Sequence, residues 1–256
     1  MRTLSTILLL IFTVLQPALA QDKIRINFHS DFEQAAFSKP DLDPFELLLS
    51  PDPEMTLNKY TRIQDQFSEI MSKAFDLKEK SKSEVQFLER LFYTIHRKNL
   101  SWYENYVTFG DLIEHKKYDC LTGTALLALV MNELDIKHQI LEFDFHIFLM
   151  AEVAHQMVLM EATDPMNGFV SEADQIHARI EEAYNSAGVS DEFNKTGIMN
   201  KIDLVDLAGL QYYNLAVDQF NRGNYSHARE FIKKADILYP SERIKNTASL
   251  IATSSL

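Results

Sequence analysis

The chain contains one cysteine, Cys120, and its local sequence suits a nucleophile. Asp119 can cap a helix of about 15 residues that begins at Cys120. The unpaired N–H groups and the dipole of a helix N-terminus favour a thiolate, so we expect the pKa of Cys120 to lie below that of a free thiol. A single cysteine cannot form an internal disulfide, and the alternative is a buried structural thiol.

His146 and Asp164 are the candidate base and orienting carboxylate. Two extended runs, 138–153 and 157–163, are expected to pair as a hairpin whose turn centres on His155. In that register His146 and Asp164 face each other across antiparallel strands, close enough for an imidazole–carboxylate hydrogen bond. The imidazole would take the thiol proton and the carboxylate would hold its tautomer. His155 is the competing base, but the tip of a turn would orient it poorly, and a slip of one residue would break the pairing.

This order of residues resembles the catalytic core of the transglutaminase-like superfamily, which comprises papain-related thiol enzymes. The family pattern is a cysteine opening a helix, a histidine followed two residues later by an aromatic residue, and a terminal Asp-Pro. Cys120, His146 with Phe148, and Asp164-Pro165 match it, although the family's usual tryptophan is phenylalanine here. The resemblance covers residues 100–170.

The resemblance implies an α+β fold in which a nucleophile helix packs on a small antiparallel sheet. It also implies attack on amides through an acyl-enzyme, by hydrolysis or acyl transfer and without a cofactor. The backbone N–H of Cys120 can supply one oxyanion donor. Trp102, Tyr103 and Tyr106 are candidates for the second, with core packing as the alternative for each. His115 either lies at the mouth of the cleft or is a surface histidine. The remaining histidines are expected on the surface: His29, His96, His138, His177 and His227.

Residues 1–20 have the pattern of a signal peptide. Arg2 supplies a positive start, Leu4 to Val14 an apolar segment, and Ala18 to Ala20 a cleavage site, which would leave Gln21 as the first mature residue. The apolar segment is too short to span a membrane, so we expect no stable membrane anchor, with an uncleaved anchor as the alternative. The mature protein is therefore expected in the periplasm or outside the cell.

Composition excludes several functional classes. The formal net charge of −12 disfavours binding to nucleic acid or to anionic lipid. The chain has no His-Glu-x-x-His motif, no pair of cysteines and no Asp-rich calcium loop, and it has no glycine-rich phosphate loop. We therefore expect neither a metal nor a cofactor, and we expect a peptide or protein as substrate.

The rest of the chain is expected to be mostly helical, in three parts. Residues 21–100 should form an irregular arm up to about Pro53, with a short strand-like segment at Ile24 to Phe28, and then helices. One of those helices should start near Ser81. Residues 101–170 form the transglutaminase-like core, with a turn of helix at Asp111 to His115. The apolar face of the helix near Ser81 comprises Phe87, Leu88, Leu91, Phe92 and Ile95.

Residues 171–256 form a C-terminal helical region that carries a second resemblance, to a single tetratricopeptide repeat. Ala216 and Ala228 would let two antiparallel helices touch, Gly223 would make the turn between them, and Pro240 would end the second helix. The other matching positions are Tyr212, Leu215, Tyr225, Ile232 and Ala235. This hairpin offers a surface for a protein partner, and the alternative is a helical cap on the core.

Together these features predict an exported thiol protein that acts as a cysteine peptidase, amidase or acyltransferase. The alternative is a catalytically inactive protein that binds or assembles peptides or proteins through the cleft and the C-terminal helices.

Overall fold

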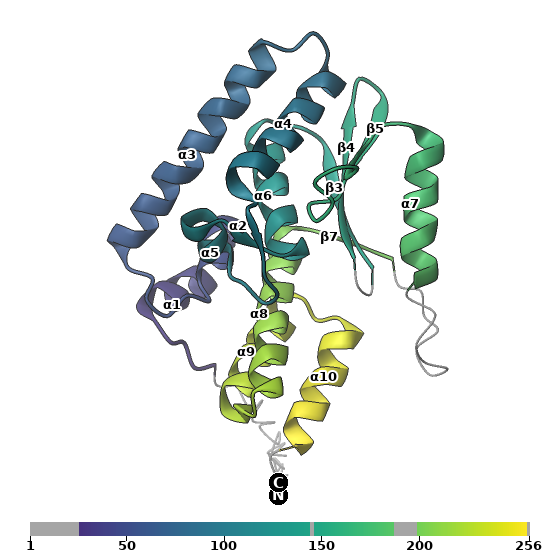
Figure 1. Cartoon of the computed structure of the whole chain (residues 1–256). Helices are drawn as coiled ribbons and strands as arrows, with labels where there is room; N and C mark the ends of the chain where they lie inside the picture. Colours follow the sequence, from purple (N-terminus) through teal and green to yellow (C-terminus); the bar gives the residue numbers. More distant parts are fainter. Residues whose placement is uncertain (1–25, 144–145, 187–198, 255–256) are drawn as a thin grey trace, which may run out of the picture.

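The computed structural model describes residues 26–143, 146–186 and 199–254 of the chain. The predicted signal peptide, residues 1–20, lies outside these ranges. The described part is an α+β structure in which helices surround a small antiparallel sheet (Figure 1). No helix within the described ranges is both long enough and apolar enough to cross a membrane.

The five-stranded sheet has the order β6-β5-β4-β3-β7, and all its neighbouring strands are antiparallel. Its strands are β3 (His138–Glu142), β4 (Ile147–Val153), β5 (Gln156–Met160), β6 (Phe169–Val170) and β7 (Asn200–Ile202). The extended run expected over 138–153 is thus two strands, because the chain turns back after Glu142. Two further short strands, β1 (Trp102–Tyr103) and β2 (Lys117–Tyr118), pair in parallel before the helix that begins at Cys120.

The hairpin between β4 and β5 differs from the predicted register by one residue. Val153 pairs with Gln156, so the turn consists of Ala154 and His155 rather than being centred on His155. Both turn residues have positive φ, at 49° and 63°, as a two-residue turn of type I′ requires. The predicted pairing of His146 with Asp164 is therefore wrong, because a shift of one residue changes every cross-strand partner.

Helix α6 (Cys120–Glu133) is the central helix, and it begins at the predicted residue. Asp119 caps it by accepting a hydrogen bond from the Thr122 N–H at 2.8 Å. The helix packs on the sheet, and a Cβ atom on Gly123 would lie only 2.8 Å from the Cβ of Ala162. Glycine at this position therefore allows the start of α6 to approach the segment that follows β5.

The N-terminal region forms four helices within the described residues. They are α1 (Asp31–Ser38), α2 (Pro44–Leu49), α3 (Leu57–Glu79) and α4 (Glu84–Asn99). The prediction of an irregular arm over 21–53 is wrong where α1 and α2 lie. Ser30 and Asp43 cap these two helices, and Pro44 occupies the first turn of α2, where a helix tolerates proline. Helix α4 buries the predicted apolar face. Residues 26–28 are not a strand, and the rest of the strand-like segment lies outside the described ranges.

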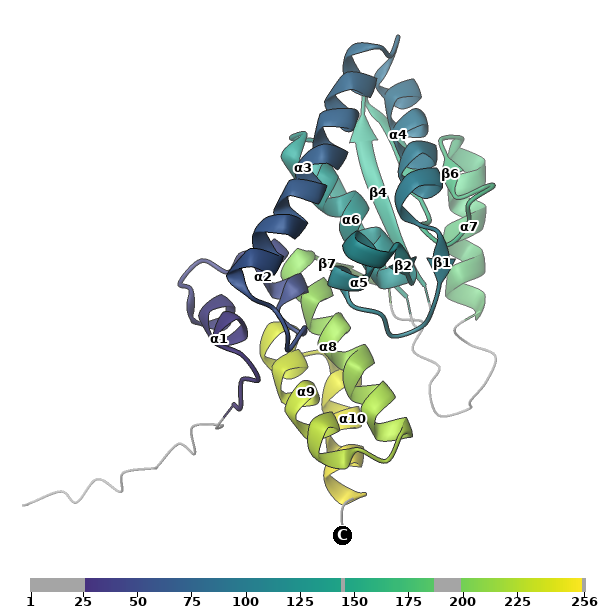
Figure 2. The ribbon, with the colours of Figure 1, turned by 60° about the vertical axis from the view of Figure 1, so that its left-hand side comes forward.

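Helix α5 (Phe109–His115) follows β1 and includes the predicted turn of helix. The C-terminal region forms α7 (Ala173–Ser186), α8 (Leu204–Asn221), α9 (Tyr225–Leu238) and α10 (Glu242–Thr253). Helices α8 and α9 run antiparallel, with Gly223 at φ +79° in the turn between them (Figure 2). Ala216 and Ala228 are fully buried, as the repeat-like spacing predicts.

One hydrophobic core extends from α1 to α10 and so crosses the boundaries expected after residues 100 and 170. Gln211 of α8 is buried and ties the C-terminal hairpin to the N-terminal region. Its side chain donates to the Leu48 carbonyl at 2.7 Å and accepts from the Phe109 N–H at 2.8 Å. Helix α7 covers the opposite face of the sheet from α6, over a separate apolar cluster (Figure 1).

Candidate active site

Cys120 lies at the first turn of α6, and its side chain is only partly exposed. Burial, with a smaller contribution from the adjacent Asp119 carboxylate, raises the pKa of the Cys120 thiol to about 12. The backbone N–H groups of Leu121 and Cys120 act in the opposite direction, as expected at a helix start. The expectation of a lowered thiol pKa is therefore wrong, because loss of solvent outweighs the favourable helix terminus.

His146 precedes β4 and has a side chain that is 43% exposed. Its backbone carbonyl accepts a hydrogen bond from the Phe143 N–H at 2.8 Å. Its ring lies 5.9 Å from the ring of Phe148, the aromatic residue two positions later. Among the described residues, the carboxylate that lies within 4 Å of its ring is that of Glu161, with Nδ1 3.8 Å from Oε1. Phe148 therefore supports the imidazole from one side while Glu161 faces its Nδ1 atom.

Glu161 is the residue that the sequence interpretation missed. It follows the last residue of β5, and its side chain is only 12% exposed. If the observed register is continued beyond β5, His146 pairs with Thr163, which makes Glu161 its diagonal neighbour on the same face of the sheet. The one signal that could have identified Glu161 is therefore the register of the hairpin.

The charge of Glu161 acts on both partners of the expected reaction. It adds to the rise in the pKa of Cys120, to which burial contributes most. Burial also raises the pKa of Glu161 itself, whereas Arg179 and His146 oppose this rise. Glu161 is thus the acidic group within electrostatic reach of both the thiol and the imidazole.

Asp164, the predicted orienting residue, stabilises a turn instead. Its Oδ1 atom accepts hydrogen bonds from the N–H groups of Met166 and Asn167, at 3.1 and 2.8 Å. Its Oδ2 atom accepts from Arg179 at 2.8 Å. Partial burial opposes ionisation, but these donors hold the pKa of Asp164 below its usual value. Among the described residues, no hydrogen bond or ion pair joins Asp164 to His146.

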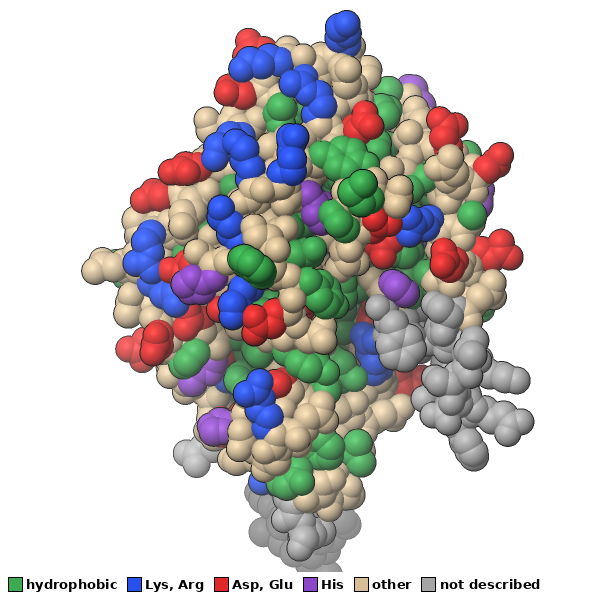
Figure 3. Space-filling model, in the orientation of Figure 1, with side chains coloured by type: hydrophobic (Ala, Val, Ile, Leu, Met, Phe, Trp, Pro, Cys, Tyr) green, Lys and Arg blue, Asp and Glu red, His purple; other side chains and the backbone are tan. Residues whose placement is uncertain are grey.

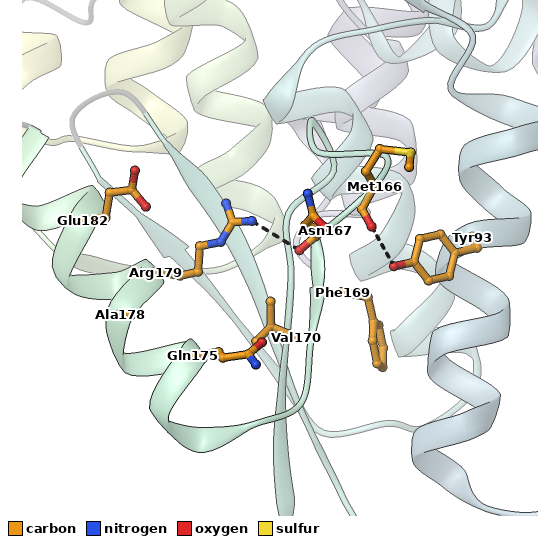
Figure 4. Close-up of a pocket in the computed structure, with 9 residues that line it drawn as sticks. All are labelled: Tyr93, Met166, Asn167, Phe169, Val170, Gln175, Ala178, Arg179 and Glu182. Carbon is orange, nitrogen blue, oxygen red and sulfur yellow. Dashed lines mark hydrogen bonds between the residues drawn. The ribbon is translucent and has the colours of Figure 1, made fainter.

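Arg179 of α7 joins the two carboxylates. Its Nη1 atom lies 3.1 Å from Glu161 Oε2, and its Nη2 atom lies 2.8 Å from Asp164 Oδ2. Nη2 also donates to the Asn167 carbonyl at 3.3 Å, the contact drawn in Figure 4. Helix α7 lies beyond the core that the sequence predicted, so the site draws on an element outside residues 101–170.

A pocket of about 380 Å³ opens beside Arg179, between α4, the loop that follows β5, and α7 (Figure 4). On its α4 side, the Tyr93 hydroxyl donates to the Met166 carbonyl at 3.2 Å and so holds the loop. The pocket is lined by Tyr93, Met166, Asn167, Phe169, Val170, Gln175, Ala178, Arg179 and Glu182. One side of the guanidinium group is therefore accessible to small molecules from solvent.

The aromatic candidates for the second oxyanion donor are exposed. Trp102, Tyr103 and Tyr106 have exposed fractions of 70%, 57% and 38%, so the core-packing alternative is wrong for all three. Burial is the main cause of the raised pKa of Tyr103, and Cys120 and Asp119 add smaller electrostatic contributions. Hydrophobic side chains also lie across the middle of the face drawn in Figure 3. Tyr103 is therefore within electrostatic reach of the start of α6.

The other histidines mostly lie where they were expected. His115 is exposed at the end of α5, and His155 is exposed at the hairpin turn. His96 is a correction: it is only 6% exposed, and its ring packs 5.0 Å from that of Phe92. Burial lowers the pKa of His96. His29 is half-buried, with Nδ1 3.2 Å from Glu33.

In the described part of the chain, no group of three or more His, Cys, Asp or Glu side chains is arranged to hold a metal ion. Comparison with known proteins found no matching family model, no matching curated protein and no matching solved structure. The functional argument therefore rests on the position of Cys120 at the start of α6, the 3.8 Å between His146 and Glu161, and the electrostatic effect of Glu161 on the thiol.

Proposed function

We propose that the protein is a transglutaminase-like thiol enzyme that attacks an amide or another acyl compound through Cys120. The main support is that one carboxylate, Glu161, interacts with both the thiol and His146. A thiol at the start of a helix that packs on an antiparallel sheet agrees with the papain-like core that the sequence resembles. In this proposal Glu161 takes the orienting role that we expected for Asp164.

The raised thiol pKa determines the order of events. Because Cys120 holds its proton at neutral pH, the proton leaves as the sulfur attacks, and His146 accepts it. The sulfur bonds to the acyl carbon, the bond to the leaving group breaks, and His146 returns the proton to that group. Water or an amine then attacks the thioester and regenerates the thiol. Glu161 stabilises the imidazolium that forms in between.

The setting of the site favours a peptide or protein as the acyl donor. The exposed aromatic side chain of Tyr103, which is within electrostatic reach of Cys120, and that of its neighbour Trp102 offer rigid surfaces against which such a chain could pack. With the N-terminal signal pattern, we propose that the reaction takes place in the periplasm or outside the cell. The C-terminal helices remain a candidate surface for a protein partner.

A non-catalytic binding protein is the second candidate. Two observations favour it: the thiol is protonated at neutral pH, and the 3.8 Å between His146 and Glu161 is too long for a hydrogen bond. In that case the aromatic surface near Cys120 would bind a peptide without cleaving it.

An acylation experiment distinguishes the two candidates. The chain is mixed with p-nitrophenyl acetate, and the released nitrophenol and the acetyl group retained on the protein are measured. The enzyme hypothesis predicts one acetyl group on Cys120, none in Cys120→Ala, and a rate lower by about 10²-fold in His146→Ala. His155→Ala is the matched control, since His155 lies on the same hairpin but at its exposed turn. Equal rates in the wild type and His146→Ala would favour the binding protein.

A further inference from the structure

We propose that Arg179 is a positioning residue that holds Glu161 in place for His146. This inference rests on the proposed function, because it concerns the same site. It assigns a role to α7, a helix that neither the predicted triad nor the predicted core includes.

The two carboxylate oxygens of Glu161 contact different groups. Oε2 lies 3.1 Å from the guanidinium group. Oε1 lies 3.8 Å from His146 Nδ1 and accepts a hydrogen bond from the Thr163 hydroxyl at 3.4 Å. With one oxygen held by Arg179, the carboxylate can turn only slightly, so the other oxygen stays directed toward the imidazole.

Asp164 fixes the guanidinium group in turn. It accepts from Nη2 at 2.8 Å while its other oxygen accepts two backbone N–H groups of the loop. Arg179 therefore spans from Glu161 to a loop that is already rigid. The planar guanidinium group presents several donors in a fixed geometry, which suits it to binding two carboxylates at once, whereas lysine offers a single charge without that geometry.

Packing of α7 holds the backbone of Arg179 against the sheet. Ile176 and Ala183 are buried, at 6% and 3% exposure, and both belong to the apolar cluster beneath α7. They lie three residues before and four residues after Arg179, which places all three on one face of the helix. The side chain of Arg179 thus extends from an anchored position toward the loop, as Figure 4 shows.

Arg179 also affects the ionisation of Glu161. Burial raises the pKa of this carboxyl group, and Arg179 has the largest effect among the groups that oppose the rise. Loss of the guanidinium charge would leave Glu161 protonated up to a higher pH. Within the described part of the chain, the charged and titratable groups that act on the two carboxylates are His146 before β4, Cys120 of α6, Arg179 of α7, and Tyr93 and His96 of α4. Glu182 of α7 also acts on Arg179.

The first test measures the rate of Cys120 acetylation by p-nitrophenyl acetate between pH 5 and pH 8 in the full chain. We expect Arg179→Ala to lower the rate between about tenfold and a hundredfold, as for a misplaced catalytic group. Because Glu161 would then ionise only at higher pH, the loss should be larger at pH 6 than at pH 8. Arg179→Lys should keep the pH profile, because it keeps the charge, and recover only part of the rate.

The second test is chemical rescue. The pocket beside Arg179 gives access to the space that Arg179→Ala leaves, so added methylguanidinium should restore part of the lost rate. A concentration of about 20 mM is far below the molar concentrations of guanidinium that unfold proteins. Arg222→Ala is the matched control, because Arg222 also pairs with an aspartate but is 68% exposed and lies at the C-cap of α8. Its rate should be unchanged by the substitution and by the added cation.

The outcomes separate this inference from the proposed function. If His146→Ala slows acetylation but Arg179→Ala does not, only the inference fails. If Arg179→Ala lowers thermal stability and rate without a change in pH profile and without rescue, Arg179 is merely structural and the inference is overturned. If Arg179→Ala does not fold, Arg179→Gln replaces it, and a wild-type pH profile in that variant overturns the inference. If His146→Ala has no effect, the proposed function fails as well.

Discussion

The protonated state of Cys120 leads to a prediction that a simple labelling experiment can test. Cys120 is the only cysteine, so iodoacetamide labelling reports on it alone. The same chain unfolded in denaturant provides the reference, because its thiol is then solvated. We expect the native chain to react more slowly than the unfolded chain at neutral pH, despite the position of Cys120 at a helix N-terminus.

The magnitude follows from the thiol pKa. A pKa of about 12 in the native chain lies about 3.5 units above the ordinary value of about 8.5. At pH 7.5 the thiolate fraction is therefore lower by roughly 10^3.5-fold than in the unfolded chain. A more basic thiolate is also a better nucleophile, so each thiolate should react about 10^1.5-fold faster in the native chain. The native chain should therefore label about 100-fold more slowly.

The assay is intact-protein mass measurement of the alkylated fraction over time, at several pH values between 6 and 10. The native rate should keep rising to the highest pH, whereas the unfolded rate should level off above about pH 8.5. A native rate equal to or faster than the unfolded rate at pH 7.5 would refute the reasoning. Such a result would mean that the thiol already exists as an ion pair with His146.

Three further predictions concern the site, the core and the N-terminus. Glu161→Gln should slow acetylation of Cys120 by about 10²-fold. Asp164→Asn should slow it less, because Asp164 acts only through the loop and Arg179. A larger loss in Asp164→Asn than in Glu161→Gln would instead support the triad of Cys120, His146 and Asp164. Lys234→Ala should lower the free energy of unfolding by about 3–5 kcal/mol, because it removes the buried ammonium group that lies 2.7 Å from the buried Glu33 carboxylate, and urea denaturation measures this directly. The exported protein should begin at Gln21, and N-terminal sequencing that finds the chain uncleaved would contradict this.

Local features of the sequence determined several elements of the structure. Asp119 before a run of small and apolar residues predicted where α6 begins, and the cap depends only on residues within one turn. The apolar spacing in α4 and the glycine at 223 were predicted for the same reason. Features that depend on near neighbours along the chain could therefore be inferred without a structure.

The register of the β4–β5 hairpin was not determined in this way. The turn residues Ala154 and His155 are not the Asn-Gly or Gly-containing pairs that mark a two-residue turn, although both adopt positive φ. The apolar pattern of the strands was compatible with a turn one residue longer. The error moved the expected partner of His146 from Thr163 to Asp164, and so the diagonal neighbour Glu161 was missed.

The tertiary structure alone decided the environment of Cys120 and Glu161. Cys120 is partly enclosed by segments distant in sequence, and this loss of solvent raises its pKa against the local effect of the helix. Arg179 comes to Glu161 from α7, which follows β6. Helix capping acts over a few bonds and can be inferred from adjacent residues. Burial and ion pairing depend on which distant segments pack together, so the sequence pointed to Cys120 and His146 as candidates but not to Glu161 and Arg179.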